Sequence, residues 1–274
     1  APMGGLVVDR ALAVGESQSA YRLATYVNAV QPVTNLFDGF LIHARGRGAA
    51  DLGDDPSQKS PSRVLIRPDT EVPVLQVESE TDLEQLGFVG ARQDDTDQVR
   101  TWEIAGAAHA DQSTLDYAIK AGRRWTDAKL DLSSSCGTIN DGPQEPVLQA
   151  AFAALDTWVD DGTLPTKSPR MTTDDAGAIV RDDDGLAEGG IRTPAVDAPI
   201  ATLSGTNPTP IVICSLFGSS TPFTPEQLAA HYPDHDAYVT AVTKSADAAV
   251  ADGFLQQATA DALIAEAKKA DIPS

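Results

Sequence analysis

One stretch near the start of the chain constrains the fold more than any other. Its apolar residues run from 6 to 14 with two polar interruptions, and the run stops at Gly15. A helical pattern follows almost at once, with apolar side chains at Tyr21, Leu23, Ala24, Val27 and Val30. Residues 6–20 are therefore predicted to form a strand, a tight turn with Ser17 at its tip, and the beginning of a helix.

Alternation of strand and helix patterns continues along the first part of the chain. Apolar runs predict further strands at residues 37–43, 72–78 and 98–105, a short helix at 83–89 and a longer helix at 145–160. Polar residues 44–63 predict a loop, and the acidic residues 94–97 predict a solvated turn in preference to a calcium loop. This order indicates an α/β fold, a mostly parallel sheet flanked by helices.

The second part of the chain has a different character. Residues 167–207 are rich in Asp, Gly, Pro and Thr and are predicted to be loop, whereas residues 224–227 have the signature of a helix start. Helical patterns at about 236–251 and 259–270 are separated by Gly253. We therefore expect a core at 1–165 and a loop-rich, helical C-terminal region at 166–274 that packs on the core.

Charge and cysteine content limit the possible partners and surroundings. The net charge of −20 argues against nucleic acids and anionic membranes as partners, because like charges repel. No apolar run approaches the roughly 20 residues of a membrane span. Cys136 and Cys214 could form one disulfide or remain two buried thiols. The acidic composition favours a secreted protein over a cytoplasmic one, although residues 1–5 do not resemble a signal peptide.

Three potentially reactive side chains each follow the end of a predicted strand: Ser17, Asp82 and His109. The carboxyl ends of parallel strands meet at one edge of a sheet, so these side chains are expected to converge. A serine becomes a nucleophile when a histidine removes its proton and a carboxylate orients that histidine. The order Ser, Asp, His along the chain is that of α/β-hydrolases, and residues 15–19 match G-x-S-x-G except that Ser19 replaces the last glycine.

Several assignments remain open at this stage. Glu80 is the alternative acid, and Glu78 lies on the same turn. His43 also ends a strand and is expected to be structural or to face the substrate, whereas His231 and His235 are expected at the surface. The backbone N–H of Gln18 is the expected oxyanion donor, and the loop that usually supplies a second donor is not recognisable. No metal site or cofactor is expected.

The chain resembles the α/β-hydrolase superfamily, and most closely the bacterial "alpha/beta hydrolase domain" esterase-like proteins. The similarity is most specific at the serine turn and the histidine segment, and it extends over much of the chain (residues 14–20, 37–43, 78–82, 102–109, 140–143, 189–196 and 216–218). It implies a serine-dependent hydrolase of carboxylic esters without a cofactor. In that fold the serine turn follows the fifth of eight strands, so this chain resembles the part from that turn onward. The preceding strands would come from a second chain or an N-terminal segment.

Functions of different classes are compatible with these patterns. The first is an esterase that forms an acyl-serine intermediate and acts on a small-molecule ester. The second is a non-catalytic, hydrolase-like binding or assembly subunit. An acyltransferase or a peptidase could use the same three side chains.

Overall fold

A parallel sheet forms the centre of the computed structural model, which describes residues 4–53, 59–125 and 132–272. Its strands are β1 (Leu12–Glu16), β2 (Gly39–His43), β3 (Val74–Ser79) and β4 (Val99–Ile104), paired side by side in that order. Every pairing is parallel. The predicted α/β fold is therefore confirmed.

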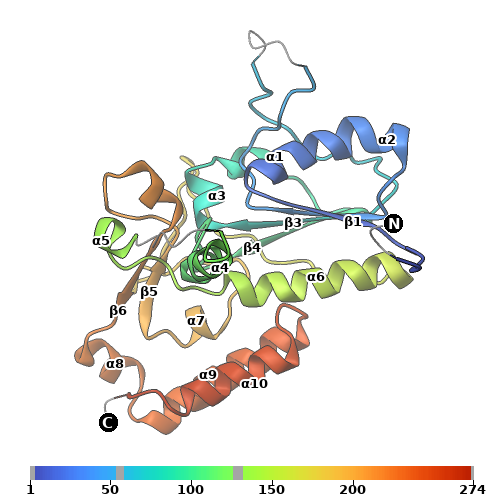
Figure 1. Ribbon diagram of the computed structural model, residues 1–274. Helices are drawn as coiled ribbons and strands as arrows, with labels where there is room; N and C mark the ends of the chain where they lie inside the picture. The colour runs from blue at the N-terminus through green and yellow to red at the C-terminus, as the bar shows by residue number, and fades with distance from the viewer. Residues whose placement is uncertain (1–3, 54–58, 126–131, 273–274) are drawn as a thin grey trace.

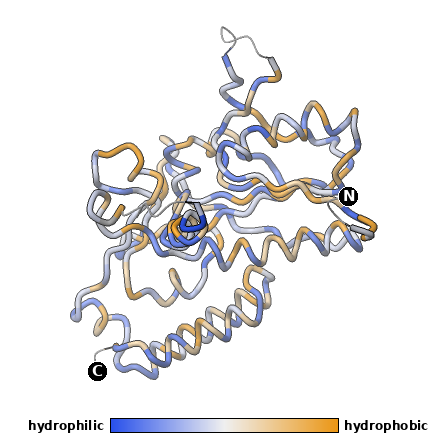
Figure 2. The backbone as a smooth tube through the Cα atoms, in the orientation of Figure 1, coloured by the Kyte–Doolittle hydropathy of each residue, from blue (hydrophilic) through white to orange (hydrophobic). Residues whose placement is uncertain are grey.

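Helices cover both faces of this sheet (Figure 1). The helices α1 (Gln18–Thr25), η1 (Tyr26–Val30) and α2 (Gln31–Thr34) lie on one face, and α6 (Gln144–Asp161) lies on the other. Phe40 and Ile42 pack with α1, whereas Leu41 packs with α6. Because both faces are buried, every residue of the inner strands β2 and β3 is buried, and β2 is a nearly continuous apolar run; Figure 2 shows hydrophobic and hydrophilic segments mixed along the sheet.

The first predicted strand differs from the observed one. We expected a strand at residues 6–14, but residues 5–11 form no regular element and β1 begins only at Leu12. The prediction was wrong there because β2 offers partners only from Gly39, which pairs with Leu12. Leu6, Val7 and Val8 consequently remain exposed.

The connections between the strands contain more helix than expected. The short helix predicted at 83–89 is replaced by α3 (Glu80–Glu84) and η2 (Phe88–Ala91). Helix α4 (Gln112–Gly122), which follows the histidine segment, was not predicted, nor was the short α5 (Ser133–Cys136). Part of the predicted loop at 44–63, residues 54–58, lies outside the described residues.

The C-terminal region contains a second, smaller sheet, and one of its two strands falls within the loop predicted at 167–207. Strand β5 (Ala201–Ser204) pairs antiparallel with β6 (Ser219–Pro222), and α7 (Pro194–Asp197) and η3 (Val212–Leu216) lie beside them in the sequence. The remaining helices are α8 (Pro225–His231), α9 (His235–Ala251) and α10 (Gln257–Ala267). Phe254 and Leu255, between α9 and α10, pack into the same apolar cluster as α6.

A disulfide joins a segment before α6 to a segment of the C-terminal region. Cys136, at the end of α5, is bonded to Cys214 in η3, 78 residues further along the chain. Of the two alternatives that the sequence left open, the structure therefore contains the disulfide. None of the described helices has the length and apolarity to span a membrane.

Candidate active site

Ser17 occupies a strained turn between β1 and α1. Its φ is 55°, in the left-handed region that side chains other than glycine rarely adopt. The turn is tight: a Cβ atom at Gly15 would lie 2.8 Å from the carbonyl carbon of Ser19, so only glycine fits there. The Ser17 N–H donates to the carbonyl oxygen of His43 at 3.0 Å, which ties the turn to the end of β2.

The three predicted side chains meet at the carboxyl ends of the strands. The distance from Ser17 Oγ to His109 Nε2 is 2.9 Å, and His109 Nδ1 lies 2.6 Å from Asp82 Oδ1. The Asp82 side chain is fully buried and that of His109 nearly so. This arrangement allows a proton to pass from the hydroxyl to the imidazole while the carboxylate holds the other ring nitrogen.

The local sequence fixes the position of Asp82. Ser79 caps α3, and its N–H and hydroxyl both donate to Asp82 Oδ2 at 2.7 Å. The second carboxylate oxygen, Oδ1, is thus left for His109. The Ser79-x-x-Asp82 spacing is a capping-box pattern, and it is the signal that could have identified Ser79 as a supporting residue from the sequence.

Two further contacts determine the position and basicity of His109. Its backbone N–H donates to Thr81 Oγ1 at 3.1 Å, which joins the histidine loop to the same turn. Burial lowers the pKa of His109, but the hydrogen bond and charge of Asp82, with a smaller contribution from Glu16, outweigh it, so that the pKa is raised above its ordinary value.

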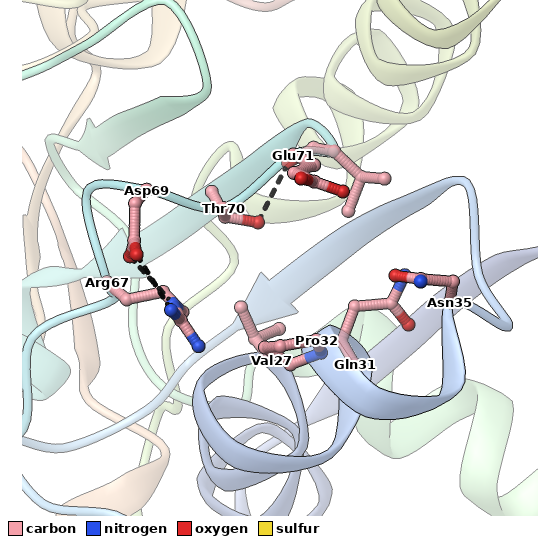
Figure 3. A pocket seen from close by; sticks show the side chains of 9 residues that line it. Val27, Gln31, Pro32, Asn35, Arg67, Asp69, Thr70 and Glu71 are labelled. Carbon is pink, nitrogen blue, oxygen red and sulfur yellow. Dashed lines mark hydrogen bonds and ion pairs between the residues drawn. The ribbon is translucent and has the colours of Figure 1, made fainter.

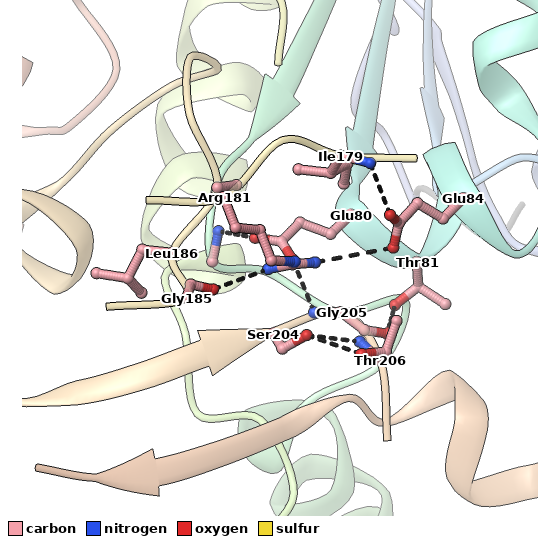
Figure 4. A network of polar contacts seen from close by, with 12 residues as sticks. Glu80, Thr81, Glu84, Ile179, Arg181, Gly185, Leu186, Ser204, Gly205 and Thr206 are labelled. Carbon is pink, nitrogen blue, oxygen red and sulfur yellow. Dashed lines mark hydrogen bonds and ion pairs between the residues drawn. The ribbon is translucent and has the colours of Figure 1, made fainter. Parts of the chain in front are cut away.

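Glu80, the alternative acid, is engaged elsewhere (Figure 4). Its carboxylate accepts hydrogen bonds from the N–H groups of Gly106 and Gly205 at 2.7 and 2.9 Å, and from Arg181 Nη2 at 2.8 Å. Burial raises the pKa of Glu80, and Arg181 opposes this effect. The geometry therefore favours Asp82 as the partner of His109 and places Glu80 between the core and the C-terminal region.

Glu78 is also fully buried, without a cationic side chain in contact with it. One oxygen accepts from the backbone N–H of Arg45 at 2.9 Å, and the other has no partner among the described residues. Burial, with the nearby charge of Asp82, raises the pKa of Glu78 well above its ordinary value. Glu78 therefore keeps its proton to a higher pH than an exposed glutamate does.

The side chains of the other histidines make different contacts. His43 is buried, and its Nδ1 lies 3.0 Å from the Val77 carbonyl oxygen. His231 Nε2 lies 3.1 Å from Asp184 Oδ2, and His235 Nε2 lies 3.1 Å from the carbonyl oxygen of Ala267.

A cavity of about 390 Å³ opens beside the serine. Ser17, Gln18 and Tyr21 form one side, and residues 44–48, 60–62 and Leu86 contribute to the rest. Gln18 is the first residue of α1, where backbone N–H groups have no acceptor within the helix. An N–H at this position is suited to an oxyanion that develops beside Ser17.

A second pocket lies at the opposite end of the sheet (Figure 3). Its walls come from η1 and α2 and from residues 67–72, just before β3 begins. Arg67 in this pocket makes two hydrogen bonds of 2.7 Å to Asp69. The charge of Arg67 is therefore already paired with that of Asp69. The pocket also lies apart from Ser17.

A comparison with known protein families places this chain in a family. Within the described residues, no group of three or more His, Cys, Asp or Glu side chains is arranged to hold a metal ion. Neither curated proteins nor solved structures gave a significant match. The family model described as "Alpha/beta hydrolase domain" matches residues 1–265, and the chain therefore belongs to the alpha/beta hydrolase domain family.

Proposed function

We propose that this hydrolase-family protein cleaves carboxylic esters through an acyl-serine intermediate. The observation that carries the proposal is the continuous chain of hydrogen bonds from Ser17 Oγ through the His109 ring to the buried Asp82 carboxylate. A strained turn holds the half-buried hydroxyl in place, while the other two groups are buried. Such an arrangement activates a hydroxyl that is otherwise a poor nucleophile.

Each residue has a defined part in the proposed reaction. Ser17 Oγ attacks the ester carbonyl as His109 Nε2 takes its proton, and Asp82 stabilises the imidazolium. The Gln18 N–H stabilises the oxyanion. His109 then returns the proton to the leaving alcohol, and water activated by the same ring releases the acid and regenerates Ser17.

Labelling and turnover test this proposal together. Ser17→Ala should abolish hydrolysis of p-nitrophenyl butyrate and labelling by a fluorophosphonate probe, because both need the hydroxyl. Ser19→Ala is the matched control, since it removes a hydroxyl from the same turn and keeps the side chain small; it should retain both. Undiminished turnover in Ser17→Ala would reject the assignment.

Labelling and turnover, extended to an amide substrate and to an added alcohol, also separate the alternative functions. A wild-type protein that neither reacts with the probe nor turns over any ester would be a binding or assembly subunit. Faster cleavage of the matching amide would indicate a peptidase. Acyl transfer to an added alcohol in preference to water would indicate an acyltransferase.

The edge of the sheet supports a proposal about partners. Among the described residues, no strand pairs with the outer side of β1, where Val14 is 50% exposed. An open apolar edge is a pairing and aggregation site, so we propose that a strand from another chain or from an N-terminal segment covers it. Native and intact mass measurements test this; a soluble, active monomer of 28.7 kDa would contradict it.

The disulfide supports the further proposal that the protein is secreted. Disulfides persist in oxidising compartments and are rare where thiols are kept reduced. Localisation of the tagged protein in its source cells, by comparing cell and medium fractions, tests this. Accumulation inside the cells alone would contradict it.

A further inference from the structure

A third cavity, larger than the two described above, lies on the α6 side of the sheet, close to Ser17. Its volume is about 620 Å³, which suits a small organic ligand. Glu16 and His43 come from the ends of β1 and β2, and the other walls come from α4 and α6, which lie next to each other in Figure 1. Tyr117 on α4 and Leu148 and Phe152 on α6 make much of the lining apolar.

Two buried polar side chains in this cavity have an atom without a partner. His43 is 4% exposed and Gln144 is 3% exposed. His43 Nε2 and Gln144 Oε1 make no hydrogen bond to any described residue. A buried polar atom left without a partner costs roughly 1–3 kcal/mol, so a ligand that satisfied both atoms would regain that free energy.

Both of these atoms are acceptors. His43 Nδ1 lies 3.0 Å from the Val77 carbonyl oxygen, which can only accept, so Nδ1 carries the proton and Nε2 presents a lone pair. Gln144 Oε1 is a carbonyl oxygen. A ligand that satisfies these two atoms must supply O–H or N–H groups.

The other polar groups of the cavity can also accept hydrogen bonds from a ligand. The hydroxyls of Ser113 and Thr114 both donate to Asp111 Oδ1 at 2.9 Å, which leaves their lone pairs free to accept. Glu16 and Glu145 add carboxylates at the exposed edge. The donors on the walls are the amides of Gln144 and Gln149 and the Tyr117 hydroxyl, and the acceptors outnumber them.

The position of the cavity suits it to bind the alcohol half of an ester. Helix α4 begins three residues after His109 and forms one wall, and the charge of Glu16, on another wall, acts on His109. The cavity beside Gln18 and Tyr21 contains no residue from the segment after His109. Because His109 must deliver a proton to the departing oxygen, the alcohol half belongs on the α4 side.

We infer that this cavity binds the alcohol portion of the substrate and selects alcohols that carry additional free hydroxyl groups, so that the preferred substrates are partial esters of polyols. The inference rests on the proposed function and deepens it by assigning a substrate class. Hydroxyl groups match His43 Nε2 and Gln144 Oε1, while the carbon chain contacts Tyr117, Leu148 and Phe152.

A cationic alcohol fits the cavity less well. The two unpartnered atoms each offer a lone pair and no negative charge, so a buried ammonium beside them would lack a compensating charge. The carboxylates of Glu16 and Glu145 lie on exposed residues, where water weakens their attraction. The buried acceptors therefore favour an alcohol with free hydroxyl groups over a cationic alcohol.

Three butyrate esters that differ only in the alcohol test this inference. They are glyceryl monobutyrate, propyl butyrate and 2-(dimethylamino)ethyl butyrate, and kcat/KM for each is divided by its rate of alkaline hydrolysis. We expect the glyceryl ester to exceed the propyl ester by about tenfold, the equivalent of one well-made hydrogen bond. A ratio near one, or a preference for the cationic ester, would overturn the inference and leave the esterase proposal intact.

Gln144→Met keeps the length of the side chain and removes both polar atoms. It should reduce the glyceryl-to-propyl ratio to about twofold or less, because an acceptor is lost. Gln257→Met, which makes the same chemical change at an exposed position on α10 away from the cavity, is the matched control and should keep the ratio. An unchanged ratio in Gln144→Met would overturn the inference.

Binding provides a readout that does not depend on turnover. Saturation-transfer NMR with the Ser17→Ala protein should show a stronger signal from glyceryl monobutyrate than from propyl butyrate, and adding Gln144→Met should remove the difference. If no ester is hydrolysed, the proposed function fails and this measurement still decides whether the cavity prefers polyols. Equal signals from the two esters would overturn the inference.

Discussion

Two regions meet at the turn after β3, and the carboxylates on that turn show how they differ. Asp82 and Glu80 are both fully buried and lie two positions apart. Asp82 faces the region of Ser17 and receives an imidazole, whereas Glu80 faces the C-terminal region and receives a guanidinium and two backbone N–H groups. Glu78, on the strand before them, receives only one backbone N–H.

The comparison teaches that the donors around a buried carboxylate, and not its burial or sequence position, determine its role. A carboxylate against a titratable ring can tune proton transfer. One held by a guanidinium joins segments together, and one without a charged partner favours its neutral form. Each of these assignments can be tested by replacing the carboxylate with its amide.

The largest effect is expected at Asp82. Asp82→Asn keeps the shape but removes the charge that stabilises the imidazolium, so kcat for p-nitrophenyl butyrate should fall by about 10⁴-fold. Steady-state kinetics measure this, with Glu78→Gln as the matched control that makes the same chemical change on the same segment. Loss of less than about tenfold in Asp82→Asn would remove Asp82 from the proposed reaction.

Glu80→Gln should affect stability more than chemistry. It removes the closer of the two carboxylates beside Arg181 and leaves Glu84 at 3.7 Å, so the loss of unfolding free energy should be at most the roughly 3 kcal/mol that breaking a buried pair costs. Urea unfolding measures the loss, and kcat per active site, titrated with the fluorophosphonate probe, should change little. A fall in kcat as large as that in Asp82→Asn, with unchanged stability, would reverse the two roles.

Glu78→Gln should change the pH dependence of stability. The folded-state pKa of Glu78 is raised above its ordinary 4.5, so the folded protein retains this proton while the unfolded chain releases it. The stability contribution is present below about pH 4.5 and is lost as the pH rises toward the folded-state pKa. Urea unfolding at several pH values should show that wild type loses stability relative to Glu78→Gln across that window; parallel curves would contradict the assignment.

The smallest effect is expected at Glu16, which is exposed. Its charge helps to raise the pKa of His109, so Glu16→Gln should shift the acid limb of the kcat/KM profile to lower pH. Glu226→Gln, at the exposed start of α8, is the control that removes the same charge far along the chain. An acid limb that stays in place would show that Asp82 alone sets the basicity of His109.

The sequence predicted what local patterns encode. Gly15, Ser17 and the apolar run before them identified the turn, and the ends of β3 and β4 placed Asp82 and His109 on the same edge as Ser17. The sequence favoured Asp82 over Glu80 but could not exclude Glu80, because the partner that occupies Glu80, Arg181, lies 101 residues away. The helix α4 had a local signal that was missed: Asp111 caps it and Leu115 is its buried residue.

Other parts of the fold depend on contacts that no local pattern reveals. The strands β5 and β6 have four residues each and pair only with each other, so neither carries a recognisable alternation. The apolar residues at 6–8 looked like strand, but pairing with β2 decides where β1 begins. The cavity between α4 and α6 likewise depends on a helix that was not predicted.

The link between Cys136 and Cys214 has a consequence for how the protein is produced. The residues it joins lie beside the segment that continues from His109: the Ala110 N–H donates to the Leu216 carbonyl oxygen, and the Gln112 N–H to that of Asn140. Closing a loop of this length is worth about 4 kcal/mol in the chain-entropy model. Expression in a host cytoplasm that keeps thiols reduced, or storage with dithiothreitol, would remove the bond between Cys136 and Cys214. The segment that follows His109 would then be held less firmly. Periplasmic or cell-free oxidative production is the suitable source of material for enzymology.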